Sequence, residues 1–492
     1  MLRSISRPTL GYIIIATLVL GPIALLAAFN MQLEPPVSDI WQHAAAIRAL
    51  IADLANPANP FVVSDEGSRH FQPLWVAGAA VAQLFGLTEW DILRAAAILS
   101  MFVFGAGIFL FSRAFYSAPW APVALLLTLI FAWLIRPQHT GLHSFHTLVY
   151  SAAYPATFLI GFSFILWAWT IRTVEGAVSP WRLVLLSLFM LTTHQLGAAI
   201  GLTVAGCFAV CWPGASLRIR VITLAAMAAG VLLSMLWPYH NPVLQMIGGA
   251  GSSWVGGTGF YTSQYMAAAF LPAGLGLLAF YQRKYWAVAM GFVILSGLFL
   301  LGLVGVTIAG RFLMPMILLM HIGLAGLILQ IFEDPQRDRS QKGLLVGIAA
   351  LTVAFLHCFY LYWAIGVEQR QRAAETHVFA AVRALTSDIP DLEPVAAISG
   401  TAWETVATGQ RIIAIPWPEP EIHDLQERQA ALARIADPQT SLAQRRSIAA
   451  QYDVRVLIAD TDNLPEATVA LFREQAVRVR SVGSVMRFDL FD

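Results

Sequence analysis

Residues 10–30 read LGYIIIATLVLGPIALLAAFN, an apolar stretch without a charged side chain. A helix that crosses the hydrocarbon of a bilayer needs about 20 such residues, and its backbone polar groups must pair within the helix. Ten further runs of this kind follow, so the sequence predicts eleven membrane spans. The runs lie at about 10–30, 92–112, 119–135, 149–171, 182–196, 197–213, 220–237, 263–280, 286–305, 311–331 and 344–366.

The composition is that of a polytopic α-helical membrane protein. The 492 residues are 58% hydrophobic and 12% charged, and their mean hydropathy is +0.67. A soluble globular enzyme and a disordered chain are excluded on this basis. The 30 Lys and Arg residues against 29 Asp and Glu leave a formal net charge of +1. No basic excess exists for the phosphate backbone of a nucleic acid.

The distribution of Lys and Arg predicts the orientation, because short cytoplasmic loops are enriched in them. With Arg3 and Arg7 inside, every inside connection carries Lys or Arg, whereas the outside connections 137–148 and 238–262 carry neither. With an odd number of spans, the tail from residue 367 lies outside. We therefore expect a cytoplasmic N-terminus and an extracytoplasmic C-terminal domain.

Two acid-bearing segments are expected on this outer side. The loop 31–91 holds seven acids and the tail 367–492 holds eighteen. Helix-like and strand-like stretches alternate in the tail, which predicts a small α/β domain. The domains are then 1–366, a transmembrane domain, and 367–492. Strand-like stretches lie at 394–399, 411–415 and 454–459, followed by two more near the C-terminus.

The outer loop also contains helix-forming patterns. Apolar residues recur at helical spacing from Ile40 to Leu54, which predicts an amphipathic juxtamembrane helix along the interface. The apolar stretch 73–87 is shorter than a span. It is either a re-entrant or interfacial helix or a twelfth crossing.

Asp39 and His43 begin the first of these helices and are four residues apart. Residues at this spacing share one helix face, with Cβ atoms about 5–6 Å apart. The pair is a candidate catalytic site at the mouth of the membrane domain. The alternative is an aspartate favoured by the helix dipole beside a surface histidine.

A second polar cluster spans Ser64 to His70 in the same loop. Asp65 and Glu66 stand close to Arg69 and His70. Carboxylates beside Arg and His bind a metal or a phosphate, or else form a solvated loop.

Polar residues at the outer ends of spans are candidates for binding an anionic head group. The Arg311 guanidinium can hold a phosphate with two hydrogen bonds, or it can snorkel to lipid head groups. His194 ends the fifth run at the same predicted level. His143, with His139 and His146, has the spacing of a helical metal face, although three interfacial histidines are also typical head-group neighbours.

Several of these segments together resemble a known family. They are Ser-Asp-Ile-Trp-Gln-His at 38–43, Phe-Gln-Pro-Leu-Trp at 71–75, Ala-Gly-Arg-Phe-Leu-Met-Pro at 309–315 and the pattern of the tail. The arrangement resembles the GT-C superfamily of polytopic glycosyltransferases, which use polyprenyl-phosphate-linked sugars. The resemblance covers the architecture of the whole chain. It implies an integral protein of a bacterial cytoplasmic membrane that acts on a glycan or lipid acceptor.

The resemblance also implies roles for residues of the first outer loop. Asp39 takes the place of the family's catalytic base or acceptor-positioning group. Asp65 and Glu66 are the candidates for a second acidic motif that assists or binds a divalent metal ion. Neither place carries Asp-x-Asp, so metal dependence stays open.

The chemistry fits the same residues. Displacing a lipid phosphate from an anomeric carbon requires one base and a cation for the phosphate, because the leaving group needs little protonation. Asp39 would take the acceptor proton, and Arg311 with His194, Arg69 or His70 would stabilise the phosphate charge. A single in-line step predicts inversion.

Two other functions share the same location. A transporter or flippase of a lipid-linked glycan needs polar features near the bilayer midplane, whereas the polar groups here gather at one outer face. A lipid-linked oligosaccharide polymerase or ligase is expected to use arginines of a late outer loop, and 238–262 has none.

Overall fold

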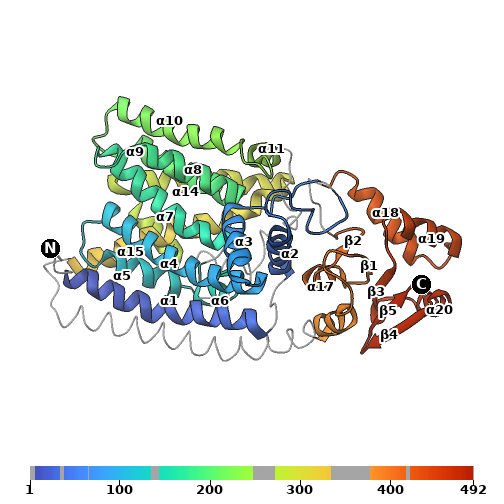
Figure 1. The fold of residues 1–492 in the computed structure, drawn as a ribbon. Coiled ribbons are helices and arrows are strands. Elements are labelled where there is room, and N and C mark those ends of the chain that lie inside the picture. Colours follow the sequence, from blue (N-terminus) through green and yellow to red (C-terminus); the bar gives the residue numbers. More distant parts are fainter. Residues whose placement is uncertain are drawn as a thin grey trace. The chain divides into compact units, whose positions relative to one another are not determined.

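The structure is a computed structural model that describes residues 6–33, 38–64, 66–133, 143–247, 272–333, 377–416 and 422–490. The chain folds as two compact units. The first comprises Met1–Asn30 and Arg94–Ala364, and the second comprises Met31–Leu93 and Ile365–Asp492. The sequence grouped the first outer loop with the membrane spans, whereas in the structure it forms one unit with the C-terminal segment (Figure 1).

The chain has the helices of an integral membrane protein. Within the described residues, six helices are long and apolar enough to cross a membrane. They are Arg7–Phe29, Glu89–Phe115, Pro155–Val174, Leu217–Ser234, Arg283–Val304 and Ile308–Phe332. Three other predicted spans correspond to shorter helices. The predicted run 344–366 lies outside the described residues, and so does 263–280 up to residue 271, after which the chain forms the 3-10 helix Ala273–Ala279. The total of eleven stays a prediction.

Regular α-helices make up most of the membrane part (Figure 1). Their bounds are α1 Arg7–Leu33, α4 Glu89–Phe115, α5 Ala121–Phe131, α6 Phe145–Ser151, α7 Pro155–Val174, α8 Trp181–Thr193, α9 Gln195–Cys211, α10 Leu217–Ser234, α11 Pro242–Ile247, α14 Trp286–Leu300 and α15 Leu313–Glu333. The 3-10 helices are η1 Ala273–Ala279, η2 Arg283–Tyr285, η3 Leu301–Val304 and η4 Thr307–Phe312.

Glycine allows two of the helices in the first unit to approach closely. A Cβ atom added to Gly107 of α4 would lie 2.3 Å from the carbonyl oxygen of Gly161 in α7. A Cβ atom on Gly161 would lie 2.8 Å from the backbone nitrogen of Phe104. Small residues at such crossings are typical of helices that pack in a membrane, where close van der Waals contact supplies much of the attraction.

The C-terminal segment contains a five-stranded sheet in the order β2-β1-β3-β5-β4. β1 is parallel to β2 and β3, while β5 is antiparallel to β3 and β4. The strands are β1 Pro394–Ile398, β2 Arg411–Ile412, β3 Val456–Asp460, β4 Arg478–Val482 and β5 Val485–Asp489. The helices are α17 Ala402–Ala407, α18 Leu425–Ala436, α19 Leu442–Gln451 and α20 Glu466–Gln475, and 377–386 is also helical. The short 3-10 helix η5 spans Thr461–Asn463.

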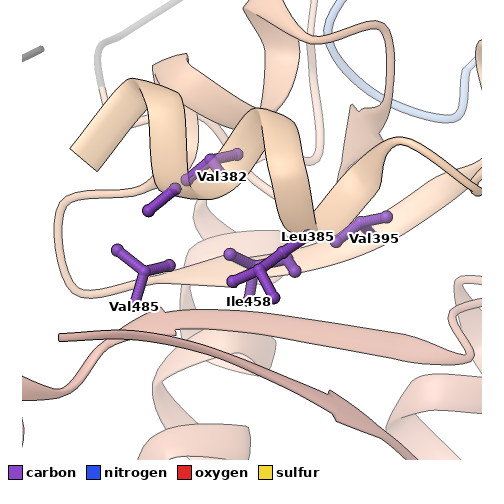
Figure 2. Packing of buried hydrophobic residues seen from close by; sticks show 6 residues of the cluster. Val382, Leu385, Val395, Ile458 and Val485 are labelled. Atoms are coloured by element: carbon purple, nitrogen blue, oxygen red, sulfur yellow. The ribbon is translucent and has the colours of Figure 1, made fainter. Parts of the chain in front are cut away.

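A cluster of aliphatic side chains holds the helical segment 377–386 on this sheet. Figure 2 shows Val382 and Leu385 facing Val395 of β1, Ile458 of β3 and Val485 of β5. All five side chains are at most 3% exposed. Burying each of them stabilises the fold by about 1.5–3 kcal/mol, so the segment covers one face of the sheet as part of its core.

The first outer loop contributes two helices to the second unit, α2 (Ser38–Ala52) and α3 (Pro73–Phe85). Ile40, Ala44 and Ile47 of α2 are completely buried. Trp41, on another side of the helix, is 5% exposed and stacks on Phe379, with ring centroids 5.7 Å apart. The helix expected to lie amphipathically along the interface is therefore enclosed by protein on more than one side.

The loop also extends the C-terminal sheet. Val62 forms a parallel bridge with Ile412 of β2, and the Ile412 backbone N–H donates to the Phe61 carbonyl at 2.7 Å. β2 ends the order of the named strands, so this pairing satisfies backbone groups of an edge strand. The bridge gives a physical reason why residues 31–93 fold with the C-terminal segment.

Candidate active site

The structure places Asp39 in the first turn of α2, and its side chain lies outside the described part of the chain. Asp65 also lies outside the described residues. The assigned roles of both carboxylates stay predictions. The backbone supports the first step of the reasoning, since Asp39 and His43 occupy one helix at a spacing of four residues.

His43 is buried between α2 and α3. The indole Nε1–H of Trp75 donates a hydrogen bond to His43 Nδ1 at 3.3 Å, and the imidazole is 8% exposed. An acceptor nitrogen carries no proton, so the neutral His43 ring has its proton on Nε2. The sequence indicated His43 as a candidate without showing that a tryptophan of the next helix sets its tautomer.

The structure brings His70 next to His43. The centroids of the two imidazole rings are 5.4 Å apart, and His70 is 6% exposed. His70 also meets the edge or face of Phe61 at 5.2 Å, and Phe61 meets Trp403 of α17 at 5.7 Å. Two of the predicted site residues thus lie together in an aromatic environment built from both parts of the second unit.

Several buried polar atoms of this unit have no hydrogen-bond partner in the described residues, and three of them lie on α2, beside α3 and on α17. They are Trp41 Nε1, Gln72 Oε1 and Trp403 Nε1. Their side chains are at most 7% exposed. Buried polar atoms are nearly always paired, so each calls for a water molecule or a polar ligand group.

Glu66 faces the C-terminal segment. Its carboxylate pairs with Nδ1 of His423 and accepts a hydrogen bond from the His423 backbone nitrogen at 3.4 Å. Arg69, also expected at this site, is half-buried. No group of three or more His, Cys, Asp or Glu residues in the described ranges is arranged to hold a metal ion. Metal binding at Asp65 and Glu66 therefore stays a prediction.

Asn59 organises this part of the loop, a role that sequence reasoning missed. Its side chain is completely buried and donates to the carbonyls of Glu66 and Gly67 at 3.3 and 3.2 Å. Its amide oxygen accepts from the backbone nitrogens of Phe61 and Val62 at 3.0 and 3.2 Å. The signal in the sequence was the dipeptide Asn59-Pro60, a pattern that favours turns.

The remaining two predicted site residues belong to the first unit. His194 separates α8 from α9 in an extended conformation, and its Nδ1 accepts from the Gly197 backbone nitrogen at 3.0 Å. The break between the two helices thus lies at His194, close to the predicted boundary between the runs 182–196 and 197–213. Arg311 is half-buried in η4. The phosphate-binding roles of Arg311 and His194 stay predictions.

Two histidines of the first unit, His143 and His321, form a hydrogen-bonded pair. His321 Nε2 donates to the Ala132 carbonyl at 3.0 Å, so its Nδ1 accepts the proton of His143 Nε2 at 3.1 Å. Both rings are nearly or fully buried. These contacts make His321 a structural residue of the first unit. The metal face predicted for His143 rests on His139 and His146, whose side chains lie outside the described part of the chain.

Comparisons with known proteins identify the fold. No family model and no curated protein matches the chain. The arabinofuranosyltransferase AftD from Mycobacteria is similar in structure, with a TM-score of 0.55 and 14% identity. The match covers 100% of this chain and 42% of AftD, so this chain spans less than half of that protein.

An oligosaccharyltransferase from Archaeoglobus fulgidus also matches, in its apo form, with a TM-score of 0.47, 11% identity and coverage of 91% of this chain and 70% of that one. The archaeal oligosaccharyltransferase AglB from Archaeoglobus fulgidus, in complex with an inhibitory peptide and a dolichol-phosphate, matches with a TM-score of 0.46 and 11% identity. That match covers 91% of this chain and 69% of AglB. The similarity to AftD shows that the chain shares the fold of this membrane glycosyltransferase, in agreement with the fold that the sequence resemblance implied.

Proposed function

We propose that the protein transfers a sugar from a polyprenyl-phosphate donor to a glycan or lipid acceptor outside the cytoplasm. One observation carries the proposal. The fold shared with an arabinofuranosyltransferase extends over the whole chain, including the loop that bears Asp39 and His43. Fold alone does not define chemistry, so the remaining support comes from the residues of this loop.

The proposed reaction is one inverting displacement. The Asp39 carboxylate takes the proton of an acceptor hydroxyl as its oxygen bonds to the anomeric carbon of the donor sugar. The bond from that carbon to the phosphate oxygen breaks, and the electron pair leaves with the polyprenyl phosphate. A base positioned in this way typically contributes about 10²- to 10⁴-fold in rate.

His43 supports the base in this proposal. Its Nδ1 accepts from the Trp75 indole, so the proton of the neutral ring is on Nε2. We assign to this N–H the orientation of the Asp39 carboxylate or of the incoming hydroxyl. The donor phosphate is assigned to Arg311, because a guanidinium matches two phosphate oxygens at once.

The function is tested with purified full-length protein in lipid nanodiscs and a panel of polyprenyl-phosphate sugars. Wild type is expected to release polyprenyl phosphate and to form a glycosylated acceptor of inverted anomeric configuration. Transport of the intact lipid-linked glycan without cleavage would support a flippase and contradict the proposal.

Asp39→Asn tests the role of the base, and Asp53→Asn is its matched control. Asp53 lies just after α2, where its Oδ1 accepts from the backbone nitrogens of Ala55 and Asn56. An asparagine oxygen can accept the same bonds, so Asp53→Asn is expected to keep full activity. Asp39→Asn is expected to lose at least about 100-fold in kcat while inserting normally into the membrane. Full activity of Asp39→Asn would remove Asp39 from the mechanism.

A further inference from the structure

Arg48 connects three segments of the second unit. It lies on α2, about two and a half turns after Asp39. Its Nη1 donates to the Val406 carbonyl at 3.1 Å, and its Nη2 donates to the Ala407 carbonyl at 2.8 Å. The same Nη2 pairs with the carboxylate of Glu89, the first residue of α4, at 2.5 Å.

The guanidinium of Arg48 stabilises both the carbonyl groups at the end of α17 and the carboxylate of Glu89. Val406 and Ala407 end α17, where the last carbonyls of a helix lack partners within it and carry partial negative charge. The Arg48 side chain is 12% exposed and the Glu89 side chain is 14% exposed. A charge pair so enclosed is hard to break, because the partner left behind stays charged and poorly solvated.

The contacts of Arg48 restrain how α2 can move. Trp75 holds one side of the helix through His43, and Arg48 holds another part of it on α17 and α4. Two attachments along one short helix oppose both its rotation about its axis and its sliding. The guanidinium of Arg48 therefore helps to fix the position of the side chains on α2.

We propose that Arg48 is a positioning residue for sugar transfer, acting through α2 on Asp39 and His43. This inference rests on the proposed function. The Arg48 guanidinium binds Val406, Ala407 and Glu89, so the proposed role is positioning. It ties the helix that bears the base to the C-terminal segment, so that segment takes part in setting the geometry of the reaction.

The test compares Arg48→Ala, Arg48→Lys and Arg383→Ala in full-length protein in nanodiscs. Arg383 is an exposed arginine of the same unit and serves as the control. The first measurement is hydrogen–deuterium exchange of peptides covering residues 38–52 and 402–410. We expect exchange to rise at least about tenfold in both peptides for Arg48→Ala and to stay unchanged for Arg383→Ala.

The second measurement is steady-state transfer kinetics. For Arg48→Ala we expect kcat to fall about 100-fold, as for a misplacement of about 1 Å, with the donor KM within about twofold of wild type. Arg48→Lys keeps the charge but not the forked donor geometry, so it should recover about tenfold of the loss. A loss of activity through general unfolding would instead reduce the fraction of active protein and leave kcat per active site unchanged.

Glu89→Gln provides a milder variant if Arg48→Ala does not accumulate in the membrane. It leaves both carbonyl bonds of Arg48 in place and should shift exchange and kcat in the same direction by smaller factors. Unchanged exchange in the variants overturns the anchoring role, and raised exchange with wild-type kcat overturns the positioning role. If wild type transfers no sugar from any donor, the proposed function fails, whereas the exchange data still decide whether Arg48 anchors α2.

Discussion

The indole N–H of Trp75 donates its hydrogen bond to Nδ1 of His43, and this contact joins α3 to α2 in the second unit. Trp75 is completely buried, so the donor is shielded from water. The bond fixes which nitrogen of the imidazole keeps its proton. A residue without acid–base chemistry thus determines the protonation pattern of a candidate catalytic residue.

Replacing Trp75 by Phe tests this relationship. The variant keeps most of the buried aromatic surface but removes the N–H donor, so His43 Nδ1 loses its partner. We expect a loss of about 1–3 kcal/mol in stability and about tenfold in kcat, since either tautomer becomes accessible. Thermal unfolding and transfer assays measure the two effects. Trp181→Phe, at an indole that is 57% exposed, is the control, and equal kcat in both variants would contradict the role of the Trp75 donor.

Arg311→Ala tests binding of the donor phosphate. A hydrogen bond to a charged group is worth about 1.5–3 kcal/mol, so the donor KM should rise at least about tenfold while the acceptor KM stays within about twofold. Arg283→Ala is the matched control, because Arg283 is exposed beside Trp286 and is predicted to lie on the cytoplasmic side. Unchanged donor KM in Arg311→Ala would indicate that this arginine interacts with lipid head groups instead.

Asp388 is expected to control the acid stability of the second unit. Hydrogen bonds from Arg480 and Arg487 lower the pKa of this carboxyl from 3.8 to about 2. Because the folded pKa is depressed, the stabilisation is present above the unfolded pKa and is lost as the pH falls from about 4 towards 2. The side chain is 50% exposed, so solvent screening keeps the contribution modest, at most about 1 kcal/mol.

Asp388→Asn should therefore lower the midpoint of urea unfolding at pH 7 and flatten its decline between pH 4 and pH 2. Unfolding of the full-length chain is measured through hydrogen exchange in the peptides that contain β4 and β5. Glu474→Gln, at an exposed carboxylate of α20, serves as the comparison. An identical pH dependence in wild type and Asp388→Asn would show that the two arginines do not stabilise the folded state.

The end of α3 is predicted to contact lipid. Leu84 and Phe85 are 80% and 73% exposed, while Trp75 at the beginning of the helix is buried. α3 has 13 residues and is about 20 Å long, too short to cross the hydrocarbon. A spin label on Leu84→Cys, in a background without the native cysteines, should be more accessible to oxygen than to a water-soluble nickel complex. The reverse order is expected at Glu474→Cys, and the same order at both sites would contradict lipid contact.

Local sequence patterns predicted the elements well but not their assembly. The length of the apolar runs located α1, α4, α7, α10 and α15, because burial in lipid imposes a long, continuous apolar signal. Gln195 and Gly197 indicated the break between α8 and α9 to within about three residues, since a polar residue and a glycine interrupt the apolar run there. The span predicted at 119–135 appears as the shorter α5, because hydropathy reports composition and not the point at which a helix ends.

The candidate site was less predictable, because its contacts join residues far apart in the chain. The spacing of four residues placed Asp39 and His43 on one helix, and this required only local geometry. No local pattern connected His43 with His70, or Arg48 with α17. Any residue can accept a hydrogen bond through its backbone carbonyl, so the side chains of Val406 and Ala407 could not predict the contact with Arg48.

The bridge between Val62 and Ile412 has a consequence for biosynthesis. Val62 leaves the ribosome long before Ile412 is translated. The backbone of the loop at Val62 therefore cannot form this pairing until about 350 further residues have been added. The pairing therefore requires translation beyond Ile412, and a product that ends before this residue would leave the β-edge at Val62 unpaired.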